Sequence, residues 1–148
     1  NKGLGDSTTK LPFYSFTDNN DGASSLFKRI DYETTQKMNG YIEIETISNI
    51  INQYNIDCID LLCMDVQGFE LNVLKGAGEY LKNIKYIIME EPSPIINLKY
   101  LPKNTYTKYI GAPTPDEINH YMIQNNFIEI CRIKENEIED NVMYINID

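Results

Sequence analysis

The chain has 148 residues, of which 42% are hydrophobic, which is enough for one folded domain with a hydrophobic core. Acidic residues outnumber basic residues 22 to 13, so the formal net charge is −9. Because nucleic acids and anionic membranes attract clusters of Lys and Arg, this balance argues against binding to either.

The N-terminal third is expected to form two strands separated by loops. Residues 1–10 are polar and contain glycine, which indicates a loop. Residues 11–16 are rich in apolar and aromatic side chains and predict a strand, whereas residues 17–25 are rich in Asp, Asn, Gly and Ser and predict a loop. Residues 41–47 alternate between apolar and polar side chains, as in a strand with one buried face.

Strand and helix patterns then follow each other. Ser48 stands where a helix N-cap is expected, before apolar residues at helical spacing. Residues 59–64 are apolar at nearly every position, which predicts a central parallel strand covered on both faces. Residues 66–82 carry an apolar helix face, which we expect to break near Gly76 and Gly78.

A second strand and a second helix are expected after this unit. Residues 84–89 are apolar and predict a strand that Pro92 stops. Residues 92–113 read as a long loop, which is more often functional than not. Thr114-Pro115-Asp116-Glu117 predicts a helix start, with Thr as N-cap, Pro in the first turn and acids near the positive end of the helix dipole.

The chain is expected to end in a β-hairpin. Residues 127–133 and 142–147 predict two strands around a polar turn over residues 134–141. Two strand–helix units with apolar strands favour an α/β fold with a parallel sheet, to which the hairpin adds antiparallel strands at one edge.

Acidic side chains follow both predicted parallel strands. Asp65 ends the first strand and is either a helix cap or a site carboxylate that acts as a base or hydrogen-bond acceptor. Glu70 would lie in the first helical turn, where the helix dipole alone could explain it. Glu90 ends the next strand, and gathering three acids at one sheet edge has no structural reason, so we favour a site. We expect Glu91 to be a solvated neighbour.

Cysteine and histidine give little evidence of further chemistry. The three cysteines are Cys58, Cys63 and Cys131, an odd number without a CxxC motif, which favours buried thiols in a reducing compartment such as the cytoplasm. His120 is the single histidine, so no metal site is expected, and a surface or packing role suits it better than catalysis. No apolar run approaches membrane-spanning length.

The central segment resembles a known family. The run Asp65-Val66-Gln67-Gly68-Phe69-Glu70, followed by Val73-Leu74-Lys75-Gly76-Ala77, is similar to the signature of the FkbM-type methyltransferases. Further matches fall in the same order over roughly residues 10 to 147, at Ser24-Ser25-Leu26, Thr46-Ile47, Glu90 and Asn126-Phe127. The resemblance implies a Rossmann-like methyltransferase sheet, S-adenosylmethionine as the methyl donor, and a hydroxyl of a sugar or other small molecule as the acceptor. It also implies that Asp65 orients or deprotonates that hydroxyl, and that Glu70 and Glu90 position it or hold a cation.

The sequence also departs from the family pattern. Phe69 replaces a small residue and is expected to reshape the space beside Asp65, and Ser48 replaces an Asp. The Gly-rich turn and the ribose-binding acid of the family are not found in residues 1–148, so no cofactor-binding residues are identified. We therefore expect one methyltransferase-like domain over 1–148 that lacks the N-terminal cofactor-binding half, with the strand 59–64 left as an exposed apolar edge that favours a homo-oligomer.

Two functions from different classes follow. The first is an S-adenosylmethionine-dependent O-methyltransferase. The second is a non-enzymatic methyltransferase-like module that serves in binding or oligomerisation. A carbohydrate-binding module that uses the Tyr-rich stretch Tyr100, Tyr106 and Tyr109 has only composition in its favour.

Overall fold

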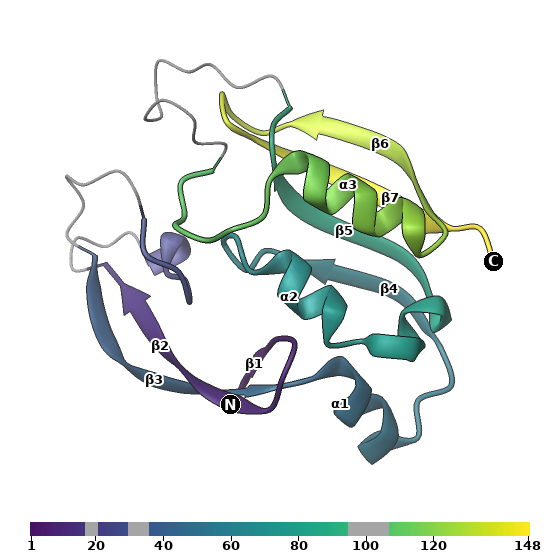
Figure 1. Ribbon diagram of the computed structural model, residues 1–148, viewed down its shortest axis with the longest axis horizontal. Helices are drawn as coiled ribbons and strands as arrows, with labels where there is room; N and C mark the ends of the chain where they lie inside the picture. The colour runs from purple at the N-terminus through teal and green to yellow at the C-terminus, as the bar shows by residue number, and fades with distance from the viewer. Residues whose placement is uncertain (17–20, 30–35, 95–106) are drawn as a thin grey trace.

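The computed structural model describes residues 1–16, 21–29, 36–94 and 107–148, which form a mixed α/β fold with two separate sheets (Figure 1). The smaller sheet contains β1 (Gly3–Leu4), β2 (Thr9–Ser15) and β3 (Lys37–Glu45) in the order β1-β3-β2. The predicted strands at 11–16 and 41–47 are confirmed, with shifted ends. The larger sheet lies beside the helices and carries the carboxyl-terminal hairpin.

The prediction of a loop over residues 1–10 is wrong for β1. Gly3 and Leu4 pair in parallel with Ile44 and Glu45, and the backbone N–H of Gly5 donates to the Glu45 carbonyl at 3.0 Å. A two-residue strand has too few residues to show a period, and its partner lies far along the chain. The local pattern therefore carried no signal for it.

The first helix, α1 (Ile47–Tyr54), begins two residues earlier than expected. Thr46 is its N-cap, because the Thr46 hydroxyl accepts a hydrogen bond from the Asn49 N–H at 3.1 Å. The Ser48 hydroxyl instead lies 2.8 Å from the carbonyls of both Gly76 and Ala77. The assignment of Ser48 as N-cap is therefore wrong, since this side chain joins α1 to the turn that follows the next helix.

The larger sheet contains β4 (Ile59–Met64), β5 (Ile84–Pro92), β6 (Phe127–Lys134) and β7 (Glu139–Asn146). Its strand order is β4-β5-β7-β6, and β4 and β5 are parallel while both β7 pairings are antiparallel. The predicted hairpin is confirmed, and its second strand inserts next to β5. Within the larger sheet, parallel pairing is thus limited to β4 and β5.

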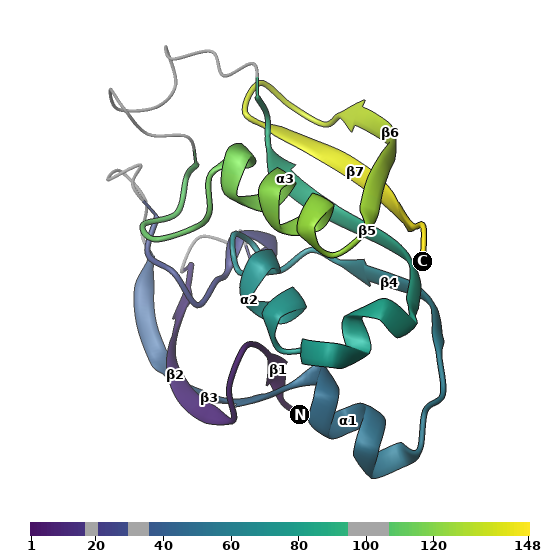
Figure 2. The ribbon, with the colours of Figure 1, turned by 45° about the vertical axis from the view of Figure 1, so that its right-hand side comes forward.

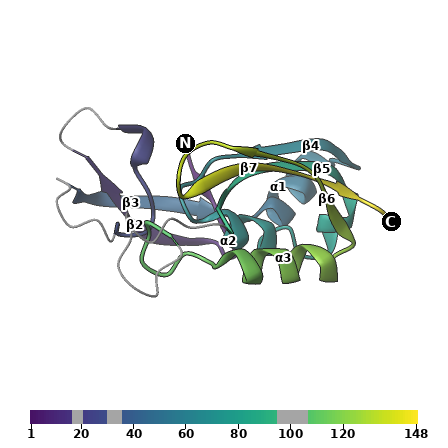
Figure 3. The same ribbon diagram turned by 90° about the horizontal axis from the view of Figure 1, so that it is seen from above.

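Three helical segments cover one face of the larger sheet (Figures 2 and 3). These are α2 (Glu70–Lys75), the 3₁₀ segment η2 (Gly78–Asn83) and α3 (Pro115–Gln124), so the expected break near Gly76 and Gly78 is confirmed. Thr114 and Glu117 form the predicted capping box of α3. The core between sheet and helices is apolar and includes Leu74, Ile87, Met89, Ile118, Met122, Val142 and Tyr144.

The opposite face of the larger sheet, called here the outer face, is covered by no described helix or strand (Figure 3). Cross-strand neighbours share a face, and the register places one apolar set there: Leu61, Cys63, Tyr86, Ile88, Ile128, Cys131, Ile133, Met143 and Ile145. Leu61 is 49% exposed and Ile133 is 63% exposed. The outer face is therefore a continuous apolar surface.

Two predictions, one about the apolar run at residues 59–64 and one about the cysteines, are wrong. The strand β4 is not central, since it pairs with β5 alone among the described strands, and it is not covered on both faces. Cys58, Cys63 and Cys131 are all free and exposed rather than buried, because Cys63 and Cys131 lie on the outer face and Cys58 precedes β4. In the described part of the chain, no helix is long and apolar enough to cross a membrane.

Candidate active site

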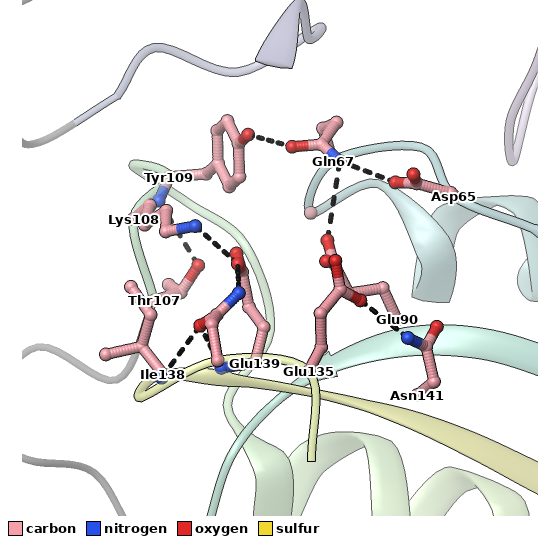
Figure 4. Close-up of polar contacts among 12 residues, drawn as sticks. Asp65, Gln67, Glu90, Thr107, Lys108, Tyr109, Glu135, Ile138, Glu139 and Asn141 are labelled. Atoms are coloured by element: carbon pink, nitrogen blue, oxygen red, sulfur yellow. Dashed lines mark hydrogen bonds and ion pairs between the residues drawn. The ribbon is translucent and has the colours of Figure 1, made fainter. Parts of the chain in front are cut away.

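A polar cluster forms where the carboxyl ends of β4 and β5 meet the loop over residues 65–69 (Figure 4). The Gln67 side-chain nitrogen donates to Asp65 Oδ1 at 2.5 Å and, more weakly, to Glu90 Oε2 at 3.4 Å. Asp65 is exposed, whereas Glu90 is 8% exposed. The structure thus brings Asp65 and Glu90 together through a side chain that the sequence analysis did not single out.

Glu70 begins α2, but its carboxylate folds back onto the preceding loop. Its Oε1 atom accepts hydrogen bonds from the backbone N–H groups of Val66 at 3.1 Å and Gly68 at 3.2 Å. Burial raises the pKa of Glu70 from 4.5 to about 7. The backbone donors lower this pKa and the Asp65 charge raises it, but both effects are smaller than that of burial. Glu70 therefore satisfies the loop backbone, and it does so from a position that is 2% exposed.

Glu90 lies in the most acidic part of the site. Its pKa is raised from 4.5 to about 8, first by burial and then by the charges of Glu139, Asp65 and Glu135, while Lys108 opposes the shift. Lys108 itself pairs with Glu139, and the Asn141 amide donates to Glu135 (Figure 4). At neutral pH the Glu90 carboxyl is consequently mostly protonated and able to donate a hydrogen bond.

The loop between β4 and α2 has an unusual backbone. Gln67 has a φ of 53° and Gly68 a φ of 94°. A Cβ atom on Gly68 would stand 3.0 Å from the Ala112 Cβ and 3.1 Å from the Tyr109 ring, so close packing as well as turning calls for glycine here. The Ser25 hydroxyl donates to the Gln67 carbonyl at 2.8 Å and fixes the loop from the other side.

Tyr109 completes the cluster. Its ring is 2% exposed and its hydroxyl donates to the Gln67 side-chain oxygen. Burial raises the pKa of this hydroxyl, so it remains a donor at physiological pH. Tyr100 and Tyr106, which belong to the same Tyr-rich stretch, lie outside the described residues.

A pocket of about 200 Å³ opens beside Asp65, between the smaller sheet and the loop. Ser24, Ser25 and Asp65 supply its polar groups. The Phe69 ring, which is 4% exposed and packs 5.2 Å from the Phe27 ring, forms part of one wall. The other apolar side chains of the wall are Leu4, Phe13, Leu26, Ile42 and Val66. Phe69 thus forms part of the wall of the space beside Asp65, and its effect on the shape of this space relative to a small residue stays a prediction.

Glu91 is not the solvated neighbour that we expected. It is 2% exposed and lies on the helix-covered face of β5, where it accepts hydrogen bonds from the Tyr144 hydroxyl at 2.6 Å and from Arg132 Nη2 at 3.2 Å. Burial raises its pKa, and these two partners lower it in part. Because successive residues of a strand point to opposite faces, Glu90 and Glu91 have separate environments.

Neither the histidine nor a metal site adds to the cluster in the described part of the chain. His120 is exposed on α3, in agreement with a surface role. Within residues 1–16, 21–29, 36–94 and 107–148, no three or more His, Cys, Asp and Glu side chains are arranged to hold a metal ion.

Searches of curated proteins and of solved structures found no match. The family model described as the methyltransferase FkbM domain matches residues 2–131, which is most of the chain. The chain therefore belongs to the FkbM methyltransferase family.

Proposed function

We propose that this protein is an S-adenosylmethionine-dependent O-methyltransferase that acts on a hydroxyl of a sugar or another small molecule. The observation that carries the proposal is the position of Asp65. Its carboxylate is exposed at the carboxyl end of β4 and forms part of the wall of the pocket that also holds Ser24 and Ser25. Ligands of α/β sheets bind at this edge, and the family membership supplies the reaction type.

The residues around this pocket fit part of the methyl donor. Apolar walls from Leu4, Phe13 and Phe69 suit an adenine ring or a methionine side chain, and the Asp65 carboxylate suits a sulfonium cation or a ribose hydroxyl. The volume of about 200 Å³ is below the ~300 Å³ at which sites for complete cofactors begin. The described residues would therefore hold one portion of S-adenosylmethionine, which supplies an electrophilic methyl group when bound.

Asp65 is the residue that we assign to the proton transfer. A neutral hydroxyl is a weak nucleophile because its pKa lies far above 7, so a nearby base must take the proton as the oxygen–carbon bond forms. Glu90, protonated near neutral pH, would orient the acceptor by donating to a second oxygen. Glu70 would keep the loop that carries Asp65 in place through its two backbone contacts.

The charges around the site indicate the chemical class of the acceptor. Glu90, Glu135 and Glu139 lie on one side of the cluster and Asp65 on the other, while Lys108 is already paired with Glu139. Phosphates and carboxylates would be repelled there, whereas sugar hydroxyls can donate to carboxylates. We therefore propose an uncharged polyol as acceptor.

The test compares variants of Asp65 with a matched variant on the same strand. Binding of S-adenosylmethionine is first measured by calorimetry, and formation of S-adenosylhomocysteine is then followed with a panel of sugars. We expect D65N and D65A to lower kcat by roughly 10²- to 10⁴-fold, the usual contribution of a general base, with the thermal unfolding midpoint retained. D60N changes an exposed carboxylate of β4 away from the rim and should leave kcat unaltered. Full activity of D65A would contradict the assignment.

A second candidate function is a binding or oligomerisation module, and the outer face favours it. This face combines a continuous apolar surface with an edge of β4 that pairs with no other described strand, and both features favour association. Sedimentation of the unmodified chain would then give a mass above 17.1 kDa. L61K should restore the monomer, whereas I123K, which alters an equally apolar exposed side chain on α3, should not. A monomer without affinity for S-adenosylmethionine would contradict both the methyltransferase and the oligomerisation function.

A further inference from the structure

We infer that Gln67 is the positioning residue of this site, and that its side-chain amide sets the orientation of the Asp65 carboxylate and couples it to Glu90. The inference rests on the proposed function, since it concerns the reaction that Asp65 would serve. Gln67 contacts both acids through one nitrogen atom, at 2.5 Å for Asp65 and 3.4 Å for Glu90. It is the side chain through which the two acids are joined in Figure 4.

The backbone of Gln67 indicates that the side chain matters. A φ of 53° is rarely adopted by residues other than glycine, which would reach it without strain. Here the conformation is held by the Ser25 hydroxyl on the Gln67 carbonyl and by the glycine that follows. The loop therefore carries a long polar side chain at a position whose backbone conformation favours glycine.

The partners of the Gln67 amide permit a single orientation. A carboxylate oxygen that lacks a proton can only accept, so the nitrogen end must face Asp65. The oxygen end receives the hydroxyl of the buried Tyr109. If the amide were reversed, its oxygen would stand 2.5 Å from the Asp65 oxygen and the two would repel each other. The Asp65 carboxylate thus decides which end of the amide faces it, and the Tyr109 hydroxyl holds the other end in place.

The neutrality of this amide also controls the charge at Glu90. Glu90 faces Asp65 after β4, Lys108 in the turn before α3, and Glu135 and Glu139 in the hairpin. A carboxylate in place of the Gln67 amide would lie between Asp65 and Glu90 and would remove their shared donor. The negative charge already present makes such an addition unfavourable, so an amide is the group that this position requires.

The first experiment uses the unmodified protein and needs no acceptor. Side-chain amide signals of Gln67 and the carboxyl carbon of Glu90 are followed by NMR from pH 5 to pH 10. We expect the Gln67 N–H signals to shift with the same midpoint as Glu90, near pH 8. Gln67 signals that stay constant while Glu90 titrates would overturn the coupling.

The second experiment changes the amide to a carboxylate with Q67E. We expect the Glu90 midpoint to rise by about one pH unit or more, and kcat for methyl transfer to fall at least about tenfold at pH 8 with little change in KM. Q53E makes the same change on an exposed position of α1 and should alter neither quantity.

These outcomes separate the inference from the proposed function. If the unmodified protein transfers no methyl group to any acceptor, the proposed function fails, while the two NMR titrations still decide the role of Gln67. If Q67E leaves the Glu90 midpoint unchanged, Gln67 does not couple the two acids, whatever the activity.

Discussion

Replacement of Glu90 by glutamine should change how the stability of this protein depends on pH. The pKa of Glu90 rises from 4.5 to about 8 on folding, chiefly because the carboxyl is buried and faces other acids. Above pH 4.5 the unfolded chain loses this proton while the folded protein keeps it. The free energy of unfolding of the unmodified protein therefore falls as the pH rises toward 8, and E90Q removes this contribution.

The magnitude follows from the interval between the two pKa values. Each pH unit within it corresponds to about 1.4 kcal/mol, so the complete interval corresponds to at most about 5 kcal/mol. Relaxation of the structure and entry of water weaken the cost of a buried charge in real proteins, and we therefore expect about 2–3 kcal/mol. E90Q should exceed the unmodified protein in stability by this amount at pH 9 and match it at pH 4.

Urea unfolding at pH 4, 7 and 9 measures this difference. E79Q serves as the control, because Glu79 is exposed in η2 and its neutralisation should give no such dependence on pH. A difference between E90Q and the unmodified protein that is the same at pH 4 and pH 9 would refute the reasoning, since it would show that Glu90 does not keep its proton on folding.

Two further predictions concern packing and a buried carboxylate. A Cβ atom on Gly76 would lie 2.0 Å from the Gly5 carbonyl oxygen, so G76A must displace backbone and should lower the free energy of unfolding by about 3 kcal/mol or more. In the control G22A the new Cβ atom meets no atom within 4 Å, and the free energy of unfolding should change by less than about 0.5 kcal/mol. Equal thermal unfolding midpoints of the two variants would disprove the contact. Y144F leaves one Glu91 oxygen without its donor and should cost about 1–3 kcal/mol in urea unfolding at pH 7, and no loss would mean that water replaces the hydroxyl.

Short-range signals in the sequence determined much of the local structure. Thr114, Pro115 and Glu117 predicted the start of α3, because a capping box involves residues within one turn of each other. The alternation over residues 41–47 predicted β3, and the polar turn before residue 139 predicted the hairpin. The run over residues 65–77 resembles the methyltransferase signature, and the family model that matches residues 2–131 shows the same family.

The tertiary structure decided the features that depend on distant partners. Nothing local distinguishes Thr46 from Ser48 as a cap until the turn at Gly76 is placed beside α1. An apolar run such as β4 has the same pattern whether one face or both are covered, and the expectation of an exposed edge at residues 59–64 came from the family resemblance. The order of the described strands places β4 at the edge of its sheet. Gln67 gained its significance from Tyr109 and Glu90, which lie 42 and 23 residues farther along the chain. Hydrogen-bond geometry between such partners exists only after folding, so the sequence pattern contains no trace of it.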